Sequence, residues 1–142
     1  MEVDPRKRVA IFLHGGDYDR LHQACSIAAS ATAGGRDVQL FLFWWALERF
    51  VDGGFSTPAF SPPPGLERAA EAAEDAFEGG YPTAAALLEV ARASGHCTVY
   101  ACSASAGLLG RRPDEIADKV DQVVGWSAIL SLTAGVSDRF YL

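Results

Sequence analysis

Apolar positions along this chain follow two kinds of pattern, short continuous runs and longer segments with helical spacing. A short continuous run is typical of a strand that is buried on both faces of a sheet. Four such runs are present, and a short fifth strand is expected near the last residues. The predicted strands cover residues 9–13, 38–43, 96–101, 120–124 and 139–142.

Segments with helical spacing separate these strands. The first begins after Gly15-Gly16, where Asp17 or Asp19 can cap a helix, and it stops at Gly34-Gly35. Its apolar face carries Leu21, Ala24, Cys25, Ala28 and Ala31. Further helices are predicted at residues 44–51, 66–78, 82–94 (opening on Pro82), 103–109, 113–117 and 127–134.

Residues 52–65 interrupt the alternation of strands and helices. They are rich in proline, glycine and aromatic residues, a composition that excludes regular structure. We therefore expect an irregular loop here, which could serve as a lid. The helix predicted after it is strongly amphipathic, with alanines and Phe77 on one face and acidic side chains on another.

Strands that alternate with helices predict βαβ units. The expected fold is therefore α/β, with a mostly parallel five-stranded sheet and helices on both faces. The 142 residues are most simply one domain. In sheets of this kind, ligands bind beyond the carboxyl ends of the strands.

Composition narrows the class of protein. The formal net charge of −6 argues against nucleic-acid binding, which requires a basic face. No apolar run approaches the ~18 residues needed to span a membrane. We expect a cytoplasmic protein without membrane contact, in which the three cysteines are free thiols.

Reactive and aromatic side chains follow four of the predicted strands. Because the carboxyl ends of parallel strands meet at one edge of a sheet, a thiol, an imidazole and several indoles are expected to lie near one another there. The strands are followed in turn by His14-Gly15-Gly16, by Trp44-Trp45, by Cys102, and by Gly125-Trp126.

Cys102 is the strongest candidate for chemistry. It stands where a strand runs into a helix, and the free N–H groups of a helix start favour an anion such as a thiolate. Ser105, three residues later, offers a hydroxyl to the same sulfur. The alternative, a small buried residue at a strand end, stays open on spacing alone.

The other two cysteines are predicted to be structural. Cys97 lies at the far end of the same strand as Cys102, about 16 Å away at ~3.3 Å per residue, and the odd separation places it on the opposite face. A disulfide between them is therefore excluded, since it needs Cα atoms within about 7 Å. Cys25 falls on the apolar face of its helix.

The remaining candidates each have a structural alternative. His14 could act as a base or charge partner for Cys102, or be a structural histidine at a strand end. Gly15, Trp44 and Trp126 are candidate substrate contacts, although tryptophans more often pack in a core or interface. Arg111-Arg112 could attract an acidic partner or form a solvated turn. The sequence contains no phosphate loop, zinc-ligand spacing or nucleophile elbow.

Three stretches together resemble the DsrE/DsrF/DrsH-like family, in particular its soluble, peroxiredoxin-like branch. They are residues 9–24, residues 35–44, and residues 99–110 with the following 123–126. The resemblance implies a single domain with a three-layer α/β/α sandwich, and homo-oligomers that are trimers or hexamers. It also implies a cysteine that carries sulfur as a persulfide. That cysteine corresponds to Cys102, and the family's following serine corresponds to Ser105.

The leading hypothesis is a sulfur-relay protein, a persulfide carrier resembling a sulfurtransferase. Cys102 would accept a sulfur atom and pass it to a thiol, with another sulfur carrier or a rhodanese-like protein as partner and with no metal or organic cofactor. The alternative is a non-enzymatic oligomeric module that binds a small molecule or a protein through the aromatic edge and the loop at residues 55–64. A thiol peroxidase or redox sensor is a third possibility, with a resolving cysteine supplied only by another subunit.

Overall fold

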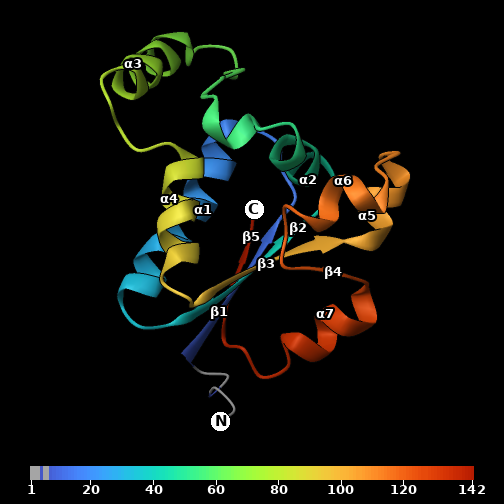
Figure 1. Cartoon of the computed structure of the whole chain (residues 1–142). Coiled ribbons are helices and arrows are strands. Elements are labelled where there is room, and N and C mark those ends of the chain that lie inside the picture. Colours follow the sequence, from blue (N-terminus) through green and yellow to red (C-terminus); the bar gives the residue numbers. More distant parts are fainter. Residues whose placement is uncertain (1–3, 5–6) are drawn as a thin grey trace.

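The computed structural model describes residue 4 and residues 7–142. In this part of the chain a five-stranded sheet is flanked by helices on both faces (Figure 1). The elements are β1 (Arg8–Leu13), α1 (Tyr18–Ala33), β2 (Asp37–Leu42), α2 (Trp44–Val51), the 3-10 turn η2 (Gly54–Ser56), α3 (Glu67–Glu78), α4 (Ala84–Ala93), β3 (Cys97–Cys102), α5 (Ser103–Leu108), α6 (Pro113–Ala117), β4 (Gln122–Val124), α7 (Trp126–Leu132) and β5 (Asp138–Tyr141).

The sheet has the strand order β4-β3-β2-β1-β5, and every neighbouring pair is parallel. The predicted α/β class and the three-layer α/β/α arrangement are therefore confirmed, and the sheet is wholly parallel. All five strands end at the same edge, because parallel strands share one direction. That edge is where α2, α5 and α7 begin (Figure 1).

Alternate residues of each strand divide the sheet into two different faces, because successive side chains point in opposite directions. The face that we call the aliphatic face packs against α1, α2 and α4, and the face that we call the aromatic face packs against α7. The aliphatic face consists of Val9, Ile11, Leu13, Val38, Leu40, Leu42, Cys97, Val99 and Ala101. The aromatic face includes Ala10, Phe12, Phe41, Phe43, Tyr100 and Cys102.

Several details of the elements differ from those expected, and some of the differences have a local cause. The fourth helix begins at Ala84 instead of Pro82, because the Thr83 side chain accepts a hydrogen bond from the Ala86 amide and makes Thr83 the N-cap. β4 begins at residue 122, because the Asp121 carboxylate takes the Val99 amide that a longer strand would pair. The segment at 52–65 was expected to lack regular structure, and it contains the single turn η2.

The segment at residues 52–65 packs on the helical layer of the aliphatic face. Phe55 is buried in the core of that face, and its carbonyl accepts a hydrogen bond from the Tyr18 hydroxyl. Phe60 packs edge-on against Tyr18. Phe55 and Phe60 therefore attach the segment to the start of α1.

The amphipathic helix α3 projects from the body of the protein (Figure 1). None of its side chains is fully buried, and the partly buried Phe77 attaches its last turn through edge-on contacts with Tyr18 and His22. Within residue 4 and residues 7–142, no helix is both long enough and apolar enough to cross a membrane.

Candidate functional site

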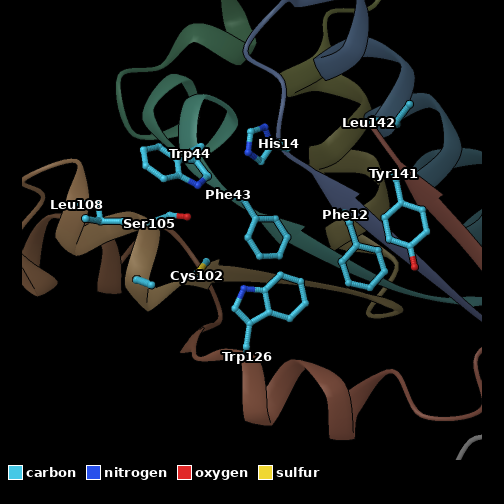
Figure 2. A pocket seen from close by; sticks show the side chains of 11 residues that line it. Phe12, His14, Phe43, Trp44, Cys102, Ser105, Leu108, Trp126, Tyr141 and Leu142 are labelled. Carbon is cyan, nitrogen blue, oxygen red and sulfur yellow. The ribbon is translucent and has the colours of Figure 1, made fainter.

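A cavity of about 440 Å³ opens at the carboxyl edge of the sheet (Figure 2). Its volume falls in the range of small-molecule sites, roughly 300–1,000 Å³. Its walls come from β1, the start of α2 with its N-cap, β3, α5, α7 and the end of β5, so it exists only when all these elements are assembled. The lining residues are Phe12, His14, Phe43, Trp44, Cys102, Ala104, Ser105, Leu108, Trp126, Tyr141 and Leu142.

The structure brings together most of the candidates named from the sequence. His14, Trp44, Cys102, Ser105 and Trp126 all line this cavity, in agreement with the expected meeting of strand ends. Gly15 does not line it: its amide donates a hydrogen bond to the Leu142 carbonyl over 3.0 Å, beside a similar bond of 2.9 Å from the His14 amide.

Cys102 is the last residue of β3 and directly precedes α5. Its side chain is only 3% exposed, and Figure 2 shows the sulfur facing the cavity between Trp126 and Ser105. Ser105 is 2% exposed, and its hydroxyl also points into the cavity. The thiol and the hydroxyl therefore present themselves to the same enclosed space, although both are shielded from bulk solvent.

The other two cysteines lie on the far side of the sheet, in the core of the aliphatic face. Burial, together with a smaller effect of the nearby Cys97, raises the pKa of Cys25 to about 12. Burial also raises the pKa of Cys97 to about 11, with Arg92 acting against the shift and Asp121 in favour of it. The prediction that Cys97 and Cys102 occupy opposite faces is confirmed, and neither buried thiol ionises at neutral pH.

His14 lies at the rim of the cavity with its ring exposed to solvent. The ring centroid is 6.4 Å from that of Trp44. In the described part of the chain no hydrogen bond joins the His14 ring to Cys102. Any influence of His14 on the sulfur therefore acts through the shared cavity and not through a direct contact.

Trp44 carries the only strained backbone among the non-glycine residues of the described chain, with φ of 44°. This left-handed conformation is rare for a bulky residue and costs about 1–2 kcal/mol. It occurs where β2 turns into α2, and the indole then lines the cavity. Hydrogen bonds on both sides hold the turn, from the Phe43 amide to the Leu13 carbonyl and from the Ala46 amide to the His14 carbonyl.

An aromatic row crosses the sheet beneath the cavity. Tyr100, Phe41, Phe12 and Tyr141 lie in register on four neighbouring strands, and adjacent rings are stacked at centroid distances of 4.8, 5.3 and 4.8 Å. Trp126, from α7, lies nearly parallel to Phe12 and Phe43, with centroids 6.4 and 5.2 Å away.

Several lining residues were missed by the sequence reasoning, namely Phe12, Phe43, Leu108, Tyr141 and Leu142. A signal for two of them was present, since Phe12 and Phe43 stand at the alternate positions of strands whose other side chains are aliphatic. Leu108 and Leu142 carry no comparable signal, because only the packing of α5 and the chain end beside β1 brings them to the cavity.

The two arginines after α5 have different surroundings from each other. Arg111 is neither a free cation nor part of a solvated turn, since its guanidinium contacts Glu48 at 2.6 Å and Asp52 at 2.5 Å. These contacts raise the pKa of Arg111 above its usual value, with the hydrogen bond to Glu48 as the main cause. Arg112, in contrast, is exposed and bonds Asp114 within its own turn. Arg111 therefore fastens the segment after α5 to α2.

The described residues contain no group of three or more histidine, cysteine or acidic side chains arranged to hold a metal ion. In comparisons with known proteins, no family model matches the chain, and no curated protein is significantly similar to it. What the cavity does chemically must therefore be inferred from its own residues.

Proposed function

We propose that this protein relays sulfur, and that Cys102 carries the transferred sulfur atom as a persulfide. The observation that supports this most strongly is the position of the three cysteines: Cys102 faces a ligand-sized cavity, whereas Cys25 and Cys97 are enclosed in the core. A thiol that must accept a sulfur atom and give it up again needs space on one side and protection from water on the others. Cys102 has both.

In the loading step, the Cys102 thiolate attacks the terminal sulfur of a donor persulfide, R–S–SH. The donor S–S bond breaks, a new S–S bond forms to Cys102, and the donor leaves as the thiolate R–S⁻. The proton stays on the transferred sulfur, and no external oxidant or reductant is needed. Unloading is the same exchange with an acceptor thiolate.

The residues around Cys102 have separate proposed roles. The first amides of α5 have no partners within the helix and favour negative charge on the sulfur, and the Ser105 hydroxyl can donate to the same atom. His14, at the rim, would act as a base or charge partner for the incoming thiol. Trp44 and Trp126 are proposed to contact the substrate. Gly15 has no proposed contact with the substrate. Its amide donates a hydrogen bond to the carbonyl of Leu142, which lines the cavity.

The test is mass spectrometry of the intact protein after incubation with inorganic polysulfide and removal of excess reagent. The wild type is expected to gain one sulfur atom that a reducing thiol removes. Cys97→Ala is the matched control, because it removes a cysteine from the other end of the same strand and should leave the gain unchanged. A gain that persists in Cys102→Ala would reject the assignment.

A second candidate function is a non-enzymatic binding module. The observation in its favour is the aromatic character of the cavity, which suits an apolar ligand whether or not Cys102 reacts. The loop at residues 55–64 is not part of that cavity. Binding of a small aromatic compound that is equally strong in the wild type and in Cys102→Ala, without any sulfur gain, would favour this function.

The proposal also covers the oligomeric state of the protein, its location in the cell and its protein partners. Several apolar side chains outside the cavity lining are exposed, among them Val123, Leu130 and Phe140, and exposed apolar surface is typical of protein interfaces. We propose a cytoplasmic homo-oligomer, a trimer or hexamer as in the family that the sequence resembles. The sulfur would be exchanged with another sulfur carrier or a rhodanese-like protein. Light scattering coupled to size exclusion tests the subunit number.

A further inference from the structure

The cavity beside Cys102 is much larger than the sulfur atom that the relay would carry. Its volume of about 440 Å³ exceeds by far the roughly 30 Å³ that one water molecule occupies in the liquid. Space of this size, open on one side, suits a molecule that brings its own body into the cavity together with its thiol.

No aspartate, glutamate, lysine or arginine side chain is among the described residues that line the cavity. The cations nearby are already engaged or turned elsewhere. Arg111 is paired with Glu48 and Asp52, and Arg49 donates to the Gly16 carbonyl. Arg20 lines a different groove, the one beneath α3. Apart from the exposed His14 at the rim, no lining side chain offers a counter-charge, so a charged body inside the cavity would lose its hydration at a cost.

The aromatic rings of the cavity are arranged in one direction. Trp126 is inclined by only 6° to Phe12 and by 18° to Phe43, and Tyr141 by 9° to Phe12. Trp126 and Tyr141 are 51% and 69% exposed, so their surfaces are only partly covered by the protein. Figure 2 shows Trp126 and Phe43 beside Cys102, with Phe12 and then Tyr141 farther from it. A flat apolar ring that enters the cavity extends an existing stack.

We infer that the sulfur acceptor of Cys102 is a small, uncharged thiol with an aromatic body. The inference rests on the proposed relay function and names the class of substrate. The acceptor thiolate R–S⁻ attacks the outer sulfur of Cys102-S–SH. The S–S bond to Cys102 breaks, R–S–SH forms with the proton on its terminal sulfur, and Cys102 leaves as a thiolate.

The first experiment compares three primary alkyl thiols as acceptors. Protein loaded with inorganic polysulfide is mixed with 2-phenylethanethiol, with the anionic 2-mercaptoethanesulfonate, or with the small neutral 2-mercaptoethanol. Mass spectrometry follows the loss of the Cys102 persulfide, and each rate is divided by the rate of the same thiol with a simple alkyl persulfide in solution. The aromatic thiol is expected to be favoured about tenfold over both others. Equal normalised rates for the three would overturn the inference.

A binding measurement separates failure of this inference from failure of the relay itself. Cys102→Ser cannot carry sulfur, so its tryptophan fluorescence is titrated with 2-phenylethanol and with 2-hydroxyethanesulfonate. Saturable binding of the aromatic alcohol alone supports the aromatic selectivity of the cavity, even if the wild type never loads sulfur and the relay is rejected. Sulfur transfer to all three thiols alike, without binding of the aromatic alcohol, keeps the relay and rejects the aromatic acceptor.

A pair of substitutions tests the ring stack. Trp126→Leu keeps an apolar side chain but removes the flat ring, and it should bring the normalised preference for 2-phenylethanethiol down to about that of 2-mercaptoethanol. Trp45→Leu is the matched control, because Trp45 is similarly exposed at 54% but lies outside the cavity. Trp45→Leu should retain the preference. A preference that survives in Trp126→Leu, or that is lost equally in Trp45→Leu, contradicts the stack as its source.

Discussion

The two faces of the sheet belong to the same five strands but differ in how completely helices cover them. The aliphatic face is covered by α1, α2 and α4, and its side chains on the three central strands β1, β2 and β3 are all buried. The aromatic face is covered by the seven-residue helix α7, and the row of rings that crosses it ends on the exposed Tyr141. The centre of the aliphatic face is closed, whereas the aromatic face is open at the cavity beside the Cys102 thiol.

Strand β3 contains this difference within six residues. Cys97 begins the strand on the aliphatic face, and Cys102 ends it on the aromatic face at the cavity. The same side chain is therefore inert at one end and accessible to a ligand at the other. The comparison teaches that the surroundings of a cysteine here depend on which face and which edge of the sheet it occupies.

The largest effect is expected when a buried side chain of the aliphatic face is shortened. Leu40 lies on β2 between Ile11 and Val99 and is fully buried. Leu40→Ala should lower the free energy of unfolding by about 3 kcal/mol, through lost burial and the cavity left behind. Urea denaturation measures it. The control Leu130→Ala, on an exposed position of α7, should change stability by no more than about 0.5 kcal/mol.

Thiol labelling sharpens the comparison between the two ends of β3. At pH 8, Cys102 should react with iodoacetamide faster than Cys97 or Cys25, because it faces the cavity and because a pKa near 11 leaves only ~0.1% of the Cys97 thiol ionised. Peptide mapping by mass spectrometry gives the three rates. Similar rates for all three cysteines in the folded protein would show that the faces do not differ in access.

Alkaline pH should weaken the closed face in particular. Burial raises the pKa of Cys25 from 9.0 to about 12, so the folded protein keeps a proton that the unfolded chain releases in this interval. The unfolded state then binds fewer protons, and this thiol makes stability fall by about 1.4 kcal/mol per pH unit as pH rises from 9 towards 12.

Urea unfolding at several pH values measures this slope. Cys25→Ala removes the group, so its slope over the same interval should be less steep by roughly that amount. Comparison of slopes, and not of absolute stabilities, cancels the loss of packing in the variant. Parallel slopes for the two proteins would contradict a buried neutral thiol.

The smallest effect is expected where the open face ends. Tyr141 stacks on Phe12 at 4.8 Å but is 69% exposed. Tyr141→Ala should therefore cost no more than about 1 kcal/mol of unfolding free energy, the worth of one exposed aromatic pair. Denaturation of this variant beside Leu40→Ala compares the faces directly. A loss as large as that of Leu40→Ala would remove the distinction between a closed and an open face.

Much of the fold could be predicted from local pattern. The apolar runs at residues 9–13 and 38–43 identified β1 and β2 to within one residue, and the helix at residues 44–51 was identified with its observed bounds. Strand parity correctly separated Cys97 from Cys102. These predictions succeeded because alternation and helical spacing are properties of neighbouring residues and need no knowledge of distant partners.

Other features depended on contacts between distant segments. Arg111 was expected to lie in a solvated turn or to attract an acidic partner, but its guanidinium forms salt bridges with Glu48 and Asp52. The loop after α2 was a candidate lid, but Phe55 and Phe60 anchor it against Tyr18 instead. Neither pairing has a local signature, because each joins residues that are far apart in the sequence.

The sequence by itself determined which residues form strands and that the sheet is mostly parallel, with the carboxyl ends of its strands at one edge. It also determined that Cys102 is the cysteine at that edge. Only the tertiary structure decided that Phe12, Phe43, Trp126 and Tyr141 wall a cavity beside Cys102, with no charged side chain among them. The physical reason is register. Strand parity is set within each strand, but the row of rings exists only because hydrogen bonds align neighbouring strands, and because α7 places Trp126 over that row.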